Sequence, residues 1–165
     1  MLTWKNIITV SVFVYCLYYL SSLDSWHFID YVNLAIHEAG HVIFIPFGYF
    51  LTVSGGTILQ LLIPVVFICY FAFRKENYSA SLLVYWLALN LFNISVYASD
   101  ALKMQLPLLT GDKDGHDWNQ ILFTLNLLRH TQFIGKAILG LGVASIIIAL
   151  IWGLYESRRT IQQRS

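Results

Sequence analysis

Residues 28–51 read FIDYVNLAIHEAGHVIFIPFGYFL, an apolar stretch interrupted by a few polar side chains. A helix needs about 20 mostly apolar residues to cross the hydrocarbon core of a bilayer, so this stretch is long enough to do so. Its polar residues are Asp30, Asn33, His37, Glu38 and His41. A charged side chain at the centre of a membrane helix costs about 2.5–3.5 kcal/mol on insertion scales. The stretch therefore predicts a membrane-associated helix that carries a polar centre.

The composition of the whole chain agrees with a membrane protein. Of its 165 residues, 58% are hydrophobic and 12% are charged, whereas soluble domains contain about 25% charged residues. The length allows a single integral membrane domain over residues 1–165. The net charge of +1 argues against a nucleic-acid partner. Cys16 and Cys69 lie in apolar runs and are expected to be buried hydrophobic side chains.

Further apolar runs predict an all-α, polytopic membrane helix bundle of about four to six segments. The expected membrane segments cover residues 6–23, 28–51, 57–73, 79–104 and 133–155, and a shorter helix covers 118–128. The sequence Ser54-Gly55-Gly56 is expected to separate the second segment from the third. Gly55, Gly56 and Gln60 suggest either a polar access site or a simple helix start.

Two topologies fit these segments. In one, all six cross the membrane; in the other, residues 28–51 re-enter on the same side and residues 118–128 do not span. Lysine and arginine divide six to four between the two sides in both arrangements. The positive-inside rule therefore does not choose between them.

The motif His37-Glu38-Ala39-Gly40-His41 has the form H-E-x-x-H. Residues four apart lie on one face of a helix, so both imidazoles can bind one metal ion. Zn²⁺ is the expected ion, with Glu38 as the catalytic base that takes a proton from water. The competing interpretation is a helix with two buried, hydrogen-bonded histidines.

A third ligand is expected from the polar loop over residues 105–117. His116 is the first choice, followed by Asp114 and Asp117, with Asp112 a weaker candidate. Asp117 also fits the N-cap of the next helix, with Gln120 at the capping-box position, which leaves it less free to bind a metal. Asp100 is expected either to orient a ligand or to reach water at the interface. His27 and His130 are expected to be ordinary interfacial residues.

The stretch from His37 to His116 resembles the site-2 protease group of intramembrane metalloproteases, the peptidase M50-like families. Those proteins carry H-E-x-x-H on a membrane helix and complete the zinc site with an Asp in a motif of the form N-x-x-P…L-D-G. Asp114-Gly115 matches the D-G pair and Pro107 stands upstream, but the chain has no N-x-x-P. Gly111-Asp112 and His116-Asp117-Trp118 also match a G-D-x-x-x-H-D-W signature of small bacterial M50-like membrane proteins.

The resemblance implies a zinc protease that cleaves a membrane-associated peptide or protein. Its surroundings would be membrane lipid, and its location a multi-pass position in a bacterial inner membrane. A different class of function also fits the residues, namely a non-catalytic metal-binding or transport protein. In that case Asn90, Asn93 and Asp100 would line a polar path.

Overall fold

The computed structural model describes residues 4–107 and 115–162, which fold into helices, with no strand in these two ranges. The elements are α1 (Trp4–Ser21), α2 (Phe28–Phe44), the 3-10 turn η1 (Ile45–Phe47), α3 (Tyr49–Phe73), α4 (Asn77–Asp100), α5 (Asp117–Thr124), the 3-10 turn η3 (Leu128–His130) and α6 (Thr131–Gln162). The predicted all-α class is confirmed.

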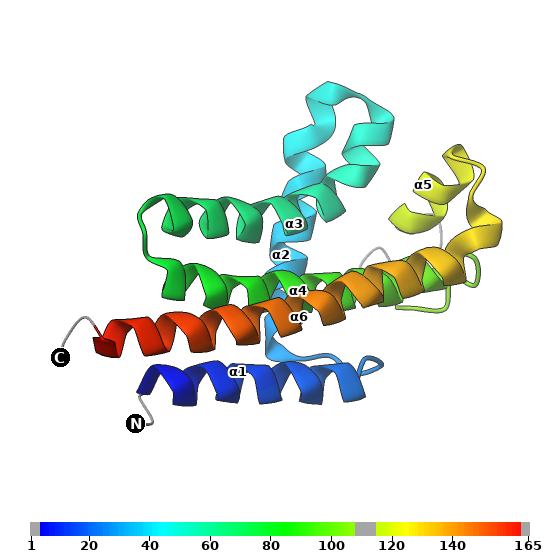
Figure 1. The fold of residues 1–165 in the computed structure, drawn as a ribbon. Coiled ribbons are helices and arrows are strands. Elements are labelled where there is room, and N and C mark those ends of the chain that lie inside the picture. The colour runs from blue at the N-terminus through cyan, green and yellow to red at the C-terminus, as the bar shows by residue number, and fades with distance from the viewer. Residues whose placement is uncertain (1–3, 108–114, 163–165) are drawn as a thin grey trace.

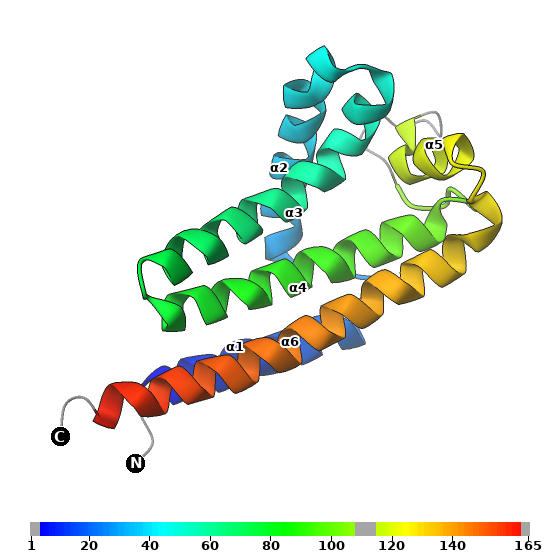
Figure 2. The same ribbon diagram turned by 45° about the horizontal axis from the view of Figure 1, so that its top comes forward.

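Four helices, α1, α3, α4 and α6, run along a common direction, and α2 crosses them steeply (Figure 1; Figure 2). Helix α4 packs against α3 and α6, and α1 packs against α6 and α4. The start of α1, the turn between α3 and α4, and the end of α6 lie at one end of the bundle, whereas α5 lies near the other (Figure 1). Helices α1 and α4 therefore run away from this end of the bundle, and α3 and α6 run toward it (Figure 1).

Three helical stretches are long and apolar enough to cross a membrane: Tyr49–Phe73, Asn77–Asp100 and Leu128–Arg159. Helix α1 is less apolar because it contains Lys5 and several tyrosines, and α2, with 17 residues, is shorter than a full span needs. Large apolar side chains, such as Phe73 and Phe133, are exposed on the outside of the bundle. An outer surface of this kind suits contact with lipid.

The core centres on α4, which lies between its neighbours. Ala88 and Phe92 of α4 are fully buried and pack with Cys16 of α1 and Ala149 of α6. Cys16 is thus buried, as expected, but the same expectation for Cys69 is wrong, because Cys69 is exposed. The difference arises because Cys69 lies on the outer face of α3 rather than against another helix.

The predicted helix break at Ser54-Gly55-Gly56 is wrong. Helix α3 runs through these residues without interruption, and the second segment ends at Phe44 rather than at residue 51. The break occurs at Pro46, which has no N–H to donate, and at Gly48, whose φ of 92° is costly for other residues. The apolar stretch over residues 28–51 therefore forms α2, η1 and the start of α3.

Candidate metal centre

Two helices from distant parts of the chain bring three potential metal ligands together. His37 and His41 lie one turn apart on α2, and Asp117 is the first residue of α5. The Oδ2 atom of Asp117 lies 2.9 Å from Nε2 of His37 and 3.2 Å from Nε2 of His41. Within the described ranges, these three residues form a group whose ligand atoms all lie within 4.8 Å of one another.

On the side away from Asp117, the Nδ1 atom of each imidazole forms a hydrogen bond to an oxygen atom. Nδ1 of His41 lies 2.8 Å from the backbone carbonyl of Thr52, and Nδ1 of His37 lies 3.1 Å from Oε1 of Gln60. Because a carbonyl oxygen only accepts hydrogen bonds, each Nδ1 carries the proton. In the neutral rings, both Nε2 atoms then direct an electron pair at the carboxylate of Asp117. This arrangement requires a positive charge between them, either protons or a metal ion.

Close packing of α2 against α3 sets the position of His37. A Cβ atom at Gly40 would overlap the backbone of Gly55, and a Cβ atom at Gly56 would overlap the imidazole of His37. Small residues allow two helices to approach this closely. The Gly55-Gly56 pair is therefore a packing surface for the H-E-x-x-H helix.

The N-cap of α5 is His116, and the prediction that Asp117 caps this helix is wrong. Nδ1 of His116 accepts a hydrogen bond from the backbone N–H of Asn119 at 3.2 Å. The carboxylate of Asp117 is thereby left to face the histidines of α2. Burial disfavours its charge, but the hydrogen bonds to His37 and His41 outweigh burial and hold the pKa of Asp117 below its ordinary value.

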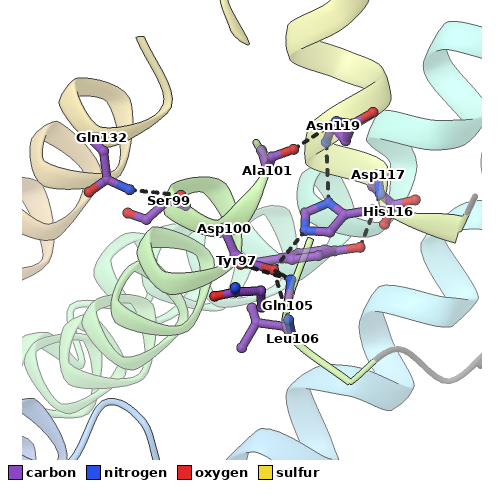
Figure 3. Close-up of polar contacts among 10 residues, drawn as sticks. All are labelled: Tyr97, Ser99, Asp100, Ala101, Gln105, Leu106, His116, Asp117, Asn119 and Gln132. Atoms are coloured by element: carbon purple, nitrogen blue, oxygen red, sulfur yellow. Dashed lines mark hydrogen bonds and ion pairs between the residues drawn. The ribbon is translucent and has the colours of Figure 1, made fainter. Parts of the chain in front are cut away.

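His116, the first choice for the third ligand, lies outside the group. Its Nε2 lies 3.3 Å from Oδ2 of Asp100, and its Nδ1 caps α5, so both ring nitrogens already have partners (Figure 3). Burial lowers the pKa of His116, while the carboxylate of Asp100 acts in the opposite direction. Of the other candidates, Asp112 and Asp114 lie outside the described residues. His27 and His130 do not belong to the group.

Asp100 and Tyr97, near the end of α4, hold the start of α5 in place. Asp100 accepts hydrogen bonds from the backbone N–H groups of Gln105 and Leu106, each at 2.9 Å, and so shapes the chain that leaves α4. The backbone N–H of Asp117 donates to the hydroxyl of Tyr97 at 3.0 Å (Figure 3). Sequence reasoning assigned no function to Tyr97 or Thr52, since neither belongs to a recognisable motif.

Glu38 lies on α2 between the two histidines of the motif and is exposed. The site is more open on the side of His41, whose side chain is 23% exposed, than on that of His37, at 9%. The group is therefore less shielded on the side on which His41 lies.

No protein-family model matches the chain, and no curated protein or solved structure matches it either.

Proposed function

We propose that the protein is a membrane-embedded zinc metalloprotease that hydrolyses peptide bonds at or within the bilayer. The observation that carries this proposal is the convergence of His37, His41 and Asp117. Two imidazoles and one carboxylate are three protein ligands, which is the number typical of catalytic zinc sites, where the fourth position is open. Structural zinc sites commonly use four protein ligands.

The donor set and its spacing fit zinc. Tetrahedral ligands that lie about 2.0–2.1 Å from zinc are about 3.3 Å apart. Oδ2 of Asp117 lies 2.9 and 3.2 Å from the two Nε2 atoms, close to that value. The oxygen acceptors behind both rings, Gln60 and Thr52, are the partners that zinc-binding histidines use to fix their orientation.

A zinc ion bound there would make a water molecule more acidic and polarise a peptide carbonyl. Glu38, beside both histidines and exposed, accepts the proton of the attacking water. It then delivers that proton to the nitrogen of the leaving amine as the peptide bond breaks. His37, His41 and Asp117 keep their positions throughout, because each is also held by α3 or α4.

The sequence resemblance to M50-like proteases supports the same proposal. A D-G aspartate completes the site in those proteins, which corresponds to Asp114 here, whereas Asp117 faces the histidines in this chain. The implied substrate is a membrane-associated peptide or protein. The multi-pass location in a bacterial inner membrane belongs to this proposal, and three stretches able to cross a membrane support it.

The competing hypothesis of a metal transporter has less support. The three polar residues expected to line its path have separate partners within the bundle. Asn90 donates to the backbone of Trp86, Asn93 donates to Asp30, and Asp100 accepts from the loop after α4. The bond of Asn90 lies within α4, that of Asn93 joins α4 to α2, and that of Asp100 shapes the loop, so these contacts do not form one continuous path.

Glu38→Gln tests the catalytic step. The purified variant is reconstituted in liposomes with a library of transmembrane peptides, cleavage is read by mass spectrometry, and zinc content is read by metal analysis. We expect Glu38→Gln to retain zinc and to lose cleavage, because an amide accepts no proton from water. His41→Ala should lose both.

The matched control is Glu76→Gln, since Glu76 is an exposed glutamate in the turn between α3 and α4. We expect it to retain zinc and full cleavage. Cleavage by Glu38→Gln at the rate of the unchanged protein would refute the proposed mechanism, and an unchanged protein that binds no zinc would refute the metal centre.

A further inference from the structure

A chain of side-chain hydrogen bonds connects His37, through α3 and α4, to a buried carboxylate near the start of α2. Nδ1 of His37 lies 3.1 Å from Oε1 of Gln60 on α3. Nε2 of Gln60 donates to Oδ1 of Asn93 on α4 at 3.2 Å. Nδ2 of Asn93 donates to Oδ1 of Asp30 at 3.3 Å, so the chain begins and ends on α2.

Asp30 is the fixed end of this chain. It is 3% exposed, and it accepts hydrogen bonds from the hydroxyl of Tyr19 at 2.6 Å and from the backbone N–H of His27 at 2.8 Å. A carboxylate with two donors already bound is an acceptor toward every further neighbour. Asn93 can therefore approach Asp30 only with its amide nitrogen.

Asp30 thereby determines which group donates and which accepts at each further hydrogen bond between Asn93, Gln60 and His37. Because the nitrogen of Asn93 faces Asp30, its oxygen faces Gln60, and Gln60 must donate to it. The oxygen of Gln60 then faces His37 and accepts only the tautomer with the proton on Nδ1. The electron pair on Nε2 of His37 is thus directed at the metal centre.

The two histidines of the motif differ in this respect. His41 faces a backbone carbonyl of Thr52, which cannot be reversed. His37 faces a side-chain amide, and an amide can rotate by 180° to present its NH₂ group with little change of shape. A reversed Gln60 would favour a proton on Nε2 of His37, and that tautomer cannot bind a metal through Nε2.

We propose that Asp30, Asn93 and Gln60 are positioning residues that hold His37 in its metal-binding tautomer. The proposal rests on the metal centre of the proposed function, but it does not require proteolysis. It assigns a chemical purpose to a buried acidic residue about two helical turns from the H-E-x-x-H motif.

The test removes the carboxylate at position 30 and then, in a second variant, introduces one at position 60. In Asp30→Asn, the amide at position 30 can donate or accept, so the direction is lost while the side-chain size is kept. We expect zinc affinity to fall about 10–100-fold, as for other residues that orient metal-binding histidines. In the metal-free protein, the ¹⁵N spectrum of His37 should show a mixture of the two tautomers rather than one.

The double variant Asp30→Asn/Gln60→Glu should restore both readouts. The carboxylate at position 60 accepts from Nδ1 of His37, Asn93 turns to donate to it, and the new amide at position 30 donates to Asn93. The chain from position 30 to His37 is then complete again, and the hydroxyl of Tyr19 accepts from the new amide instead of donating to it. A contribution of Asp30 to packing alone would not be restored by a change at position 60. If Asp30→Asn does not fold, Asn93→Leu is used instead. It removes the acceptor that fixes Gln60, so we expect the same fall in zinc affinity and the same mixture of His37 tautomers.

The matched control is Trp86→Phe. The indole N–H of Trp86 donates to Oδ1 of Asn33 at 2.9 Å, which is another hydrogen bond between α4 and α2 but is not connected to His37. We expect this variant to unfold at a lower temperature and to keep its zinc affinity and its His37 spectrum.

Unchanged zinc affinity and an unchanged His37 spectrum in Asp30→Asn would overturn the proposal, as would a double variant no better than the single one. These outcomes are distinguishable from failure of the proposed function. A protein that binds zinc and responds to Asp30→Asn, but cleaves no peptide, would refute proteolysis and leave the positioning residues in place.

Discussion

His37 and His116 are both buried histidines that face a carboxylate, and they differ in the partner on the other side of the ring. Behind His37 lies the carbonyl oxygen of Gln60, whereas behind His116 lies the backbone N–H of Asn119. The proton of His116 is therefore on Nε2, where it completes a hydrogen bond to Asp100. The proton of His37 is on Nδ1, and its contact with Asp117 needs a further proton or a metal ion at Nε2. The residue behind the ring thus distinguishes the histidine that caps α5 from the one that we propose binds the metal.

The largest effect that would test this comparison is expected when the carboxylate facing each histidine is removed. We expect Asp117→Ala to lower zinc affinity by at least about 100-fold, more than the loss of a residue that only orients a ligand, because it removes one of three ligands. The measurement is a competition titration against a chromophoric chelator.

Asp100→Ala is the matched change at the other histidine. It removes the partner of His116 and of two backbone N–H groups, so we expect lower stability with stoichiometric zinc retained. Equal loss of zinc in both variants would show that the two carboxylates are not functionally different.

A substitution on α3 tests the position of the His37 ring. The added methyl group of Gly56→Ala would overlap that ring, and we expect zinc affinity to fall about 10-fold or more, as when the orientation of a ligand is disturbed. The control is Gly140→Ala on α6, where an added Cβ has no neighbour within 4 Å. There we expect unchanged zinc binding and a gain in stability of about 0.5–1 kcal/mol. Zinc binding by Gly56→Ala equal to that of the control would contradict this packing.

The smallest effect is expected at His116 itself. Loss of an N-cap costs about 0.5–2 kcal/mol, so His116→Ala should lower the thermal unfolding temperature while zinc stays bound. His116→Asn keeps an oxygen that can accept from Asn119 and should recover part of the loss. Thermal unfolding in detergent, with metal analysis of the folded protein, measures both quantities. Loss of zinc in His116→Asn would instead indicate that His116 binds the metal.

Much of the fold could be predicted from the sequence because its signals are local. The apolar runs predict helices, and the spacing of His37 and His41 predicts that they share a helical face. The helix break was misplaced because glycines that end a helix and glycines that pack against another helix look alike in one sequence. The partner of Gly55, Gly40, is recognisable only once α2 and α3 lie together.

For a similar reason, the sequence alone did not show that Asp117, rather than His116, faces His37 and His41. Asp is a much better N-cap than His in isolation, so Asp117 was expected to cap α5. Contacts with α4 decide otherwise: Asp100 orients His116 for capping, and Tyr97 binds the backbone of Asp117. If α5 began one residue later, Asp117 would cap the helix and would no longer be free to face His37 and His41.

The separation of 80 residues between His37 and Asp117 has a consequence for biosynthesis. Both histidines leave the ribosome well before the carboxylate that faces them. During that interval the nascent chain has the motif but not the complete ligand group, and its affinity for metal should be correspondingly low. In the proposed metal centre, zinc capture is then a late step of maturation that requires α5 to have docked, and we expect a truncated chain that ends after α4 to bind no zinc.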